Sequence, residues 1–233
     1  MNIQDLIQTF RKQVSDLEAP YLWDDEEVLL YLIDAQDKFV RAMGGISDYG
    51  STRAGTTLTD IPLVVNQPMS SFSPYILRIR SAKLLTGNRN ITIIDESQLK
   101  QYSDTKDYGL QRAESLRDDD LGEVSLALIG LEDNKLRWYK VPDIADTARM
   151  HIYRLPYPRI TKQEDSLEID EQHHIHLIPW MKYWAYSKED AETYDRELAD
   201  RNEKTFNDYC DRARSEKDRQ RYKPRSVQVN PDY

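Results

Sequence analysis

Cysteine, glycine and long apolar runs are scarce in this chain of 233 residues. A single cysteine, Cys210, excludes an internal disulfide framework and a multi-cysteine zinc site. The 8 glycines argue against a glycine-rich phosphate loop. Residues 61–77 form the longest uncharged stretch, but they include three prolines, and residues 1–5 lack the basic start of a signal peptide. We therefore expect a soluble, intracellular protein without a membrane segment.

Charge and tyrosine are abundant instead. Charged residues make up 31% of the chain and hydrophobic residues 39%, which indicates much solvated surface and a modest core. Tyrosine supplies 15 of the 23 aromatic side chains, and tyrosine suits half-wet surfaces such as subunit interfaces. The net charge of −9 opposes nucleic-acid binding by the chain as a whole, although a local basic patch can override it.

Helical periodicity marks the N-terminal part of the chain. An apolar face over residues 3–17, with Pro20 as a stop signal, predicts a first helix. Asp24 is a candidate N-cap of a second helix, because Glu27 stands three residues later. This second helix should end at the glycine pair 44–45.

The C-terminal part is predicted to be helical again. Asp170 is a candidate cap of a helix in which Pro179 introduces a kink. A longer helix should follow from about Asp190, and its pattern stops after Tyr222. Its stripe mixes apolar and polar side chains: Ala191, Tyr194, Leu198, Asn202, Phe206, Tyr209 and Ala213.

Between these helices the pattern changes to short β-rich runs separated by turn residues. The predicted strands are residues 61–65, 75–85, 91–94, 124–131, 136–141 and 149–155. Residues 131–136 are typical of a hairpin turn. Residues 96–102 should form a short helix, and the polar residues 103–123 a solvated loop.

Together these patterns predict an α+β fold: an antiparallel amphipathic helix bundle with an inserted small antiparallel β-domain and an extended C-terminal arm. We expect residues 1–58 and 165–216 in the helical bundle. Residues 59–164 should form the inserted β-rich domain. Residues 217–233 should form the arm, in which Val227 and Val229 alternate with polar residues.

Side chains that often carry chemistry have simpler explanations here. His173, His174 and His176 do not share one helix face, and with His151 they show no zinc-protease spacing, so we expect no metal site. Helix capping explains the acidic run 24–27, and loop solvation explains 118–120. Cys210 is expected to be structural, although its charged neighbours leave its reactivity open. No nucleophile–base pair, catalytic motif or cofactor fingerprint is found, so we expect neither catalysis nor a cofactor.

The strongest local signal is a basic segment at residues 212–225. It holds seven basic and two acidic side chains, a net of +5 in a chain of −9. One interpretation is a strip that contacts nucleic-acid phosphates. A second is an arm that docks on an acidic protein partner, favoured by the alternating tail beyond it. A third is an ordinary solvated helix end whose cations suit the helix dipole.

The order of these parts resembles the tailed-phage head-to-tail connector, or adaptor, proteins. The resemblance covers about residues 20–45 and 130–220 and is spread along the chain. Residues 23–36 (WDDEEVLLYLIDAQ) are similar to the second helix of that family. The segments 136–142 (LRWYKVP) and 150–156 (MHIYRLP) resemble its paired strands. Residues 176–193 (HLIPWMKYWAYSKEDAET) resemble its helix–helix corner, and Phe206 and the arginine-rich end continue the match.

The resemblance implies a structural protein of the virion neck, made in the host cytoplasm, with no enzymatic activity. It implies a homo-oligomeric ring, a dodecamer, that binds the portal protein, extends the DNA channel and offers a platform for tail or nozzle proteins. Packaged DNA would pass through without sequence-specific contact. The portal-binding residues would be those of the C-terminal arm: Arg219, Arg221, Tyr222, Lys223, Arg225, Val227, Val229 and Tyr233.

Two other functions stay open from the residues alone. The first is a small nucleic-acid-binding accessory protein that uses residues 212–225 and binds in a salt-dependent way. The second is an enzyme whose active site has no recognisable motif.

Overall fold

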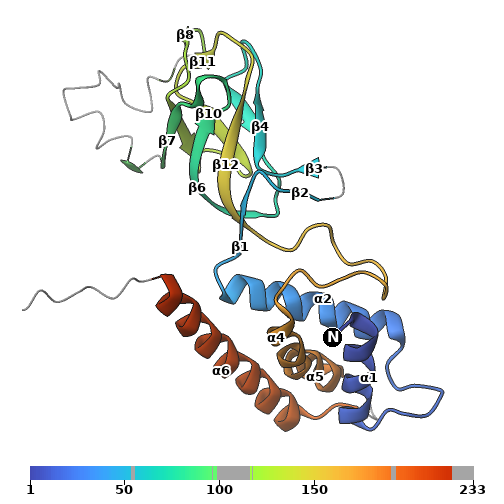
Figure 1. Ribbon diagram of the computed structural model, residues 1–233. Coiled ribbons are helices and arrows are strands. Elements are labelled where there is room, and N and C mark those ends of the chain that lie inside the picture. The colour runs from blue at the N-terminus through green and yellow to red at the C-terminus, as the bar shows by residue number, and fades with distance from the viewer. Residues whose placement is uncertain (54–55, 96, 99–115, 117, 190–192, 222–233) are drawn as a thin grey trace, which may run out of the picture. The chain divides into compact units, whose positions relative to one another are not determined.

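Figure 1 shows the computed structural model of the chain, which describes residues 1–53, 56–95, 97–98, 116, 118–189 and 193–221. The fold is mixed α+β and divides into two units. The helical unit consists of Met1–Gly44 and the chain from Arg159 onwards, and the β unit is Gly45–Pro158. The sequence predicted these boundaries at 58/59 and 164/165. Both boundaries of the β unit lie earlier in the chain than this, and the larger difference is at the first, because short strands lie between residues 46 and 57, where the apolar pattern is weak.

The first helix, α1 (Ile3–Val14), begins with a capping box. The side chain of Asn2 accepts a hydrogen bond from the backbone N–H of Asp5 at 2.7 Å, and the Asp5 carboxylate accepts one from the Asn2 N–H at 3.2 Å. The helix ends at Ser15, which has a left-handed φ of 60°. Leu17 lies beyond this end and is 62% exposed, so the predicted apolar face is shorter than expected.

The second helix, α2 (Asp25–Ala42), confirms the predicted N-cap. Asp24 Oδ1 accepts a hydrogen bond from the backbone N–H of Glu27 at 2.7 Å. Gly44 and Gly45 follow the helix with φ of 75° and 94°, a conformation that glycine adopts without strain. The buried side chains of α2 are Val28, Leu32, Ala35, Gln36, Phe39 and Val40.

The C-terminal helices are α4 (Glu171–His174), the 3-10 helix η3 (Ile175–Leu177), α5 (Ile178–Ser187) and α6 (Arg196–Arg221). Asp170 is the N-cap residue of α4, although its side chain makes no capping hydrogen bond. Pro179 lies in the first turn of α5, where a missing N–H costs little, so α5 starts there. The predicted start of the long helix at Asp190 lies outside the described residues. Asp195 accepts a hydrogen bond from the backbone N–H of Leu198 at 3.0 Å, as an N-cap would.

The helices of this unit share one apolar core. The rings of Phe10 and Trp23 meet edge to face with centroids 5.9 Å apart, and those of Trp180 and Phe206 lie 5.1 Å apart. Burying side chains of this size stabilises the unit by about 1.5–3 kcal/mol each. The buried members of the core are Ile3, Leu6, Ile7, Phe10, Trp23, Val28, Leu32, Ala35, Phe39, Ile160, Leu177, Ile178, Trp180, Met181, Ala185, Phe206, Cys210 and Ala213.

The β unit is built from short strands around one curled sheet (Figure 1). Its strands are β1 (Ile46–Tyr49), β2 (Thr52–Arg53), β3 (Thr56–Thr57), β4 (Asp60–Leu63), β5 (Met69–Ser71), β6 (Ile76–Leu84), β7 (Asn90–Asp95), β8 (Leu121–Gly122), β9 (Leu126–Ile129), β10 (Lys135–Trp138), β11 (Val141–Pro142) and β12 (Asp146–Arg154). A 3-10 turn, η1 (Thr86–Asn88), joins β6 to β7. Each of the six predicted β-runs contains a strand, and β9 and β10 form the predicted hairpin.

The strands of the main sheet follow the order β1-β12-β6-β7-β9-β10-β5, and β4 also pairs with β12. The prediction of an antiparallel domain is wrong for two strand pairs, because β7 pairs in parallel with β9 and β8 with β11. A long connection separates β7 from β9 in the sequence, which leaves room for the crossover that a parallel pair requires. The predicted helix 96–102 and loop 103–123 lie largely outside the described residues. Leu121–Gly122 form β8, which pairs in parallel with β11.

Strand β12 is the axis of the sheet. One of its edges pairs with β6, and the other is divided between β4 and β1. Its residues Ala148, Met150 and Ile152 are fully buried and face the core of the β unit. The intervening side chains point to the opposite side because the side chains of a strand alternate between its two faces. This outer side of β12 therefore carries polar and aromatic residues rather than aliphatic ones.

Candidate functional site

The predicted portal-binding residues lie at and beyond the end of α6. Arg219 is exposed on α6, and Arg221 is the last residue of that helix. Residues 217–221 are helical rather than extended, because no proline or glycine interrupts the sequence of α6. The other predicted residues lie outside the described part of the chain: Tyr222, Lys223, Arg225, Val227, Val229 and Tyr233.

The helical core holds α6 through its middle. Phe206 is fully buried against Trp180, and Cys210 and Ala213 are each 4% exposed. The predicted stripe is correct at Phe206 and Ala213, but Tyr194 is 51% exposed because α6 starts only at Arg196. The last fully apolar contact of α6 is therefore at Ala213.

A histidine and tyrosine cluster fixes α6 against η3 and α4. His173 Nδ1 and the Tyr209 hydroxyl lie 2.7 Å apart, and the His176 ring stacks on Tyr209 with centroids 3.7 Å apart. Burial lowers the pKa of His173 and of His176, and the cation of Arg212 lowers that of His176 further. These two histidines are therefore packing residues at neutral pH.

His174 also has partners inside the helical unit. Its Nδ1 lies 2.8 Å from the carbonyl oxygen of Met1, and its Nε2 lies 3.0 Å from that of Ile169. Among the described residues, no group of three or more histidine, cysteine, aspartate or glutamate side chains is arranged to hold a metal ion. His173, His174 and His176 therefore make three different contacts and do not converge on one point.

The thiol of Cys210 is buried and unreactive at neutral pH. Burial, followed by the nearby Asp211 carboxylate, raises the pKa of its thiol to about 11. The thiol therefore stays protonated at neutral pH and packs as a small apolar group in the core.

From Arg212 onwards the helix presents basic side chains to solvent. Lys217 reaches back to the end of α2, where its Nζ donates a hydrogen bond to the carbonyl oxygen of Met43 at 3.0 Å. Arg212, Arg214 and Arg219 are exposed, and we call these three residues the basic end of α6. The helix thus leads from the core to a positively charged surface.

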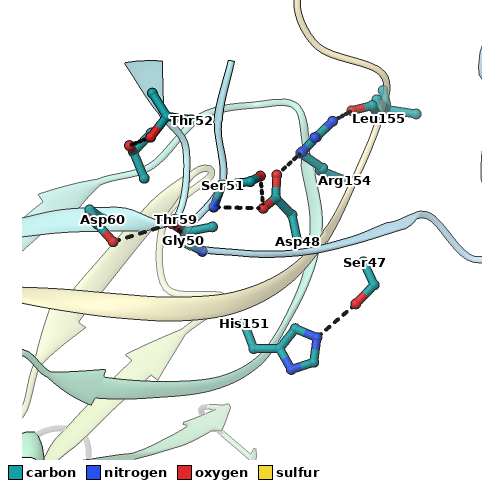
Figure 2. Close-up of polar contacts among 11 residues, drawn as sticks. Ser47, Asp48, Gly50, Ser51, Thr52, Thr59, Asp60, His151, Arg154 and Leu155 are labelled. Carbon is teal, nitrogen blue, oxygen red and sulfur yellow. Dashed lines mark hydrogen bonds and ion pairs between the residues drawn. The ribbon is translucent and has the colours of Figure 1, made fainter. Parts of the chain in front are cut away.

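In the β unit, a polar cluster fixes the base of the β2–β3 ribbon (Figure 2). Arg154 Nε donates to Asp48 Oδ2 at 2.5 Å, and both side chains are almost fully buried. Burial raises the pKa of Asp48, but the hydrogen bonds from Ser51 and the Arg154 cation outweigh it, so the pKa is lowered overall. Asp48 also accepts hydrogen bonds from the Ser51 hydroxyl and backbone N–H, which bends the chain into the ribbon.

A second ion pair joins β4 to β12. Asp60 receives two hydrogen bonds from Arg149, at 2.7 Å from Nε and 2.6 Å from Nη2, and this pairing lowers the pKa of Asp60. Thr59 accepts a hydrogen bond from the Gly50 N–H at 3.1 Å and contacts Asp60 (Figure 2). Neither ion pair was predicted from the sequence, because the partners are far apart in the chain.

The structure also brings together a serine and a histidine that no sequence motif pairs. Ser47 Oγ lies 2.8 Å from His151 Nε2 (Figure 2). The neighbouring carboxylate of Asp48 belongs to the other face of β1 and is bound to Arg154. The rings close to His151 are those of Tyr49 and Tyr153, with centroids 6.0 and 5.9 Å away. Among the residues that the structure describes, His151 therefore has aromatic neighbours, and no carboxylate takes the place of the orienting acid of a catalytic triad.

Within the described residues, no helix has the length and apolar character needed to cross a membrane. No curated protein sequence matches the chain. The family model described as "SU10 adaptor protein" matches residues 1–230, almost the full length. The predicted resemblance to phage adaptors is thereby confirmed, and the chain belongs to the SU10 adaptor protein family of phages, whose members are structural head-to-tail adaptors.

Proposed function

We propose that this adaptor assembles into a dodecameric ring below the portal, where its C-terminal residues dock on portal subunits. The observation that carries the proposal is the family match over residues 1–230, which includes most of the predicted arm. The ring would extend the DNA channel in the virion neck and provide a platform for tail or nozzle proteins.

The construction of α6 supports an anchoring role for the segment that follows it. The helix is held by Phe206, Cys210 and Ala213 in the core and by Lys217 at the end of α2. Its exposed basic end then leads directly into the predicted arm. A rigid base lowers the entropy cost of docking, because α6 itself loses no further conformational freedom when the partner binds.

Charge supports the choice of a protein partner over free DNA. The segment 212–225 has a net charge of +5 in a chain of −9, so the remainder is strongly acidic. An acidic remainder disfavours tight binding of DNA by the ring as a whole and suits a channel through which DNA moves. The basic segment would instead steer the encounter with an acidic portal surface.

The test is the mass of the purified chain, alone and mixed with the portal ring of the same phage, measured by light scattering. We expect a complex of defined stoichiometry that is lost when residues 219–233 are deleted. The double substitution Arg212→Gln/Arg219→Gln should weaken the complex, most clearly at low salt, where the charges are least screened. A matched control, Arg201→Gln/Lys204→Gln, removes the same charge from exposed positions of α6 outside the basic end.

A chain that remains monomeric and ignores the portal would refute this function. Salt-dependent binding of free DNA that is lost with residues 212–225 would favour the nucleic-acid-binding alternative. A portal complex that survives the deletion would keep the adaptor function but move its anchor elsewhere.

A further inference from the structure

The outer side of the β unit presents ordered rows of polar side chains, which the strand register defines. In the first row Ser47 of β1 pairs with Tyr153 of β12, which pairs with Arg78 of β6. In the second row Tyr49 pairs with His151, which pairs with Ser81. Paired residues of adjacent strands lie on the same face of a sheet.

The third row continues across four strands. Asp60 of β4 pairs with Arg149 of β12, which pairs with Lys83 of β6, which in turn pairs with Asn90 of β7. We call these three rows the outer sheet face. The residues between the rows, such as Ala82, Met150 and Ile152, are buried in the core on the opposite side. A register shift between His151 and Ile152 keeps Arg78 on the outer side with Tyr153.

The outer sheet face is positively charged in an acidic chain. Arg78, Lys83 and Arg149 supply cations, and Asp60 is the one carboxylate among these described rows. Asp60 is bound to Arg149 by two hydrogen bonds, which use two of the five N–H groups of the guanidinium. Positive charge therefore remains in excess on this face.

Aromatic rings lie among these cations. The Arg78 guanidinium lies 4.5 Å from the centroid of the Tyr153 ring, and Lys83 Nζ lies 5.5 Å from that of Tyr49. Tyr49 is 49% exposed, and its ring meets that of His151 edge to face. Tyr153 is buried at 5% exposure, so Tyr49 is the exposed ring of this face. A cation beside an exposed ring is a combination that binds nucleic-acid strands without reading their sequence.

The face is also hollowed at its centre. A shallow, open depression of about 370 Å³ lies over the second and third rows, and no carboxylate lines it. Its polar lining consists of groups that donate hydrogen bonds: the hydroxyls of Tyr49 and Ser81, the ammonium of Lys83, the amide of Asn90, the guanidinium of Arg149 and the imidazole of His151. Apolar atoms make up most of the lining surface, and part of the donor capacity is already used, by Asn88 at Lys83 and by Asp60 at Arg149. The donors that remain at the rim fit an anionic group that offers acceptor oxygens.

We propose that the outer sheet face binds the sugar–phosphate backbone of DNA, with a phosphate in the depression between Lys83 and Arg149 and with Arg78 on a neighbouring phosphate. The source of that DNA in the virion, the packaged genome, rests on the proposed adaptor function, whereas the binding chemistry does not. The contact is weak and independent of sequence, in the range of about 10⁻⁴–10⁻⁶ M that is usual for non-specific binding. An affinity this weak allows DNA to contact the adaptor transiently and dissociate again.

The test measures fluorescence anisotropy of labelled 20-nucleotide DNA, as a duplex and as single-stranded oligothymidine, from 50 to 200 mM salt. We expect binding to the full chain that weakens as salt rises. Arg78→Gln/Lys83→Gln should weaken it about tenfold at 50 mM salt and reduce the log–log salt slope by about 2, one for each phosphate that is no longer neutralised. Arg78 is exposed, and Lys83 is half-buried with its Nζ donating to Asn88 Oδ1 at 2.9 Å, so circular dichroism should match the parent and the melting temperature should fall only slightly.

Two matched variants carry the same loss of charge. Arg201→Gln/Lys204→Gln, on exposed positions of α6, should bind DNA like the parent. Arg212→Gln/Arg219→Gln tests the basic end of α6 as the competing DNA site and should also bind like the parent. In addition, Tyr49→Ala should weaken single-stranded binding more than duplex binding, because only unpaired bases can stack on its ring.

Several results would overturn the proposal: no binding at 50 mM salt, equal affinities of the parent and Arg78→Gln/Lys83→Gln, or a loss of binding only with Arg212→Gln/Arg219→Gln. Polyglutamate serves as a probe for an acidic protein partner. If it binds with the same dependence on Arg78 and Lys83 while DNA does not bind, the outer sheet face recognises an acidic protein rather than DNA, and the proposal is wrong. The assay contains no portal protein, so its failure leaves the adaptor function intact, and failure of portal binding leaves this result unaffected.

Discussion

The two units hold their buried charges in different ways. In the helical unit, Arg11 binds Asp16 at 2.5 Å and Asp25 at 2.6 Å, and these partners are 5 and 14 residues away in the chain. In the β unit, Arg154 binds Asp48 from 106 residues away, and Arg149 binds Asp60 from 89 residues away. The most deeply buried cation of the helical unit therefore fixes a local turn between α1 and α2, whereas that of the β unit, Arg154, joins distant strands. Half-buried pairs join distant segments in both units: Arg149–Asp60 in the β unit, and Arg159–Asp37, 122 residues apart, in the helical unit.

This difference has a consequence for stability. A buried ion pair that joins distant segments is completed only after the chain between them has folded. Losing one partner then leaves an unpaired charge inside a sheet that the pair helped to close. The β unit should therefore be more sensitive to the loss of a single charged side chain than the helical unit is to the loss of a local cap.

The largest effect is expected from Arg154→Met. The substitution leaves the Asp48 carboxylate buried without its guanidinium partner, and the free energy of unfolding of the β unit should fall by about 3–5 kcal/mol. Hydrogen exchange measured by mass spectrometry should show weaker protection in residues 46–95 and 118–158 but not in α1, α2 or α5. Adding Asp48→Asn should restore part of the loss. Equal loss of protection in both units would contradict the comparison.

A smaller effect is expected from Asp24→Ala. It removes the side-chain acceptor of the Glu27 N–H at the start of α2, and the helical unit should lose about 1 kcal/mol of unfolding free energy in urea denaturation. Glu26→Ala is the control, because Glu26 is exposed in the same turn and is not the cap residue. A loss as large as that of Arg154→Met would show that local caps matter as much as distant pairs.

Lys217→Gln should have a still smaller effect, about 0.5–1 kcal/mol, because it removes the hydrogen bond to the Met43 carbonyl from a half-buried side chain. The informative readout is local: amide exchange should speed up over residues 214–221, while the α6 core around Phe206 keeps its protection. Lys204→Gln, at an exposed position of the same helix, should change neither. If amide exchange over residues 214–221 did not change, Lys217 would not hold the end of α6 in place.

The smallest effect is expected from mild acid, which should lower the stability of the helical unit before that of the β unit. Burial lowers the folded-state pKa of His173 and His176 below 6.5, so the unfolded chain takes up protons first and the helical unit loses stability as pH falls through and below 6.5. The folded pKa values of Asp48 and Asp60 are also lowered, so their contribution is present above 3.8 and is lost only as pH falls below that value.

Urea unfolding at pH 7, 6 and 5, followed by exchange in each unit, measures this separation. We expect the helical unit to weaken first, and His173→Gln/His176→Gln to flatten its pH dependence. If the double variant keeps the full pH dependence of stability, titratable groups other than these two histidines cause it.

Local patterns in the sequence were sufficient for much of the fold. The Asp24 cap, the glycine stop after α2 and the hairpin between β9 and β10 each depend on a few neighbouring residues, and all three are confirmed. The capping box of Asn2 and Asp5 is equally local but was not predicted. An asparagine followed three residues later by an acid is a signal that could have found it.

Long-range pairing could not be predicted in the same way. Strands β1 and β5 have few residues and weak alternation, and their places beside β12 and β10 follow from contacts across the sheet. The parallel pair β7–β9 and the Ser47–His151 contact are likewise set by tertiary packing. The outer sheet face is therefore invisible in the sequence, because its cations come from separate strands and meet only through the register.

The most direct test of the proposed anchor is amine-reactive cross-linking of the adaptor mixed with its portal ring, read by mass spectrometry. Lys223 is the single lysine among residues 222–233, so it reports on the predicted arm alone. We predict abundant cross-links from Lys223 to portal lysines, and their loss when an excess of a peptide of residues 219–233 is added. Cross-links from the portal to β-unit lysines such as Lys135 and Lys140, with none at Lys223, would contradict docking through the C-terminal arm.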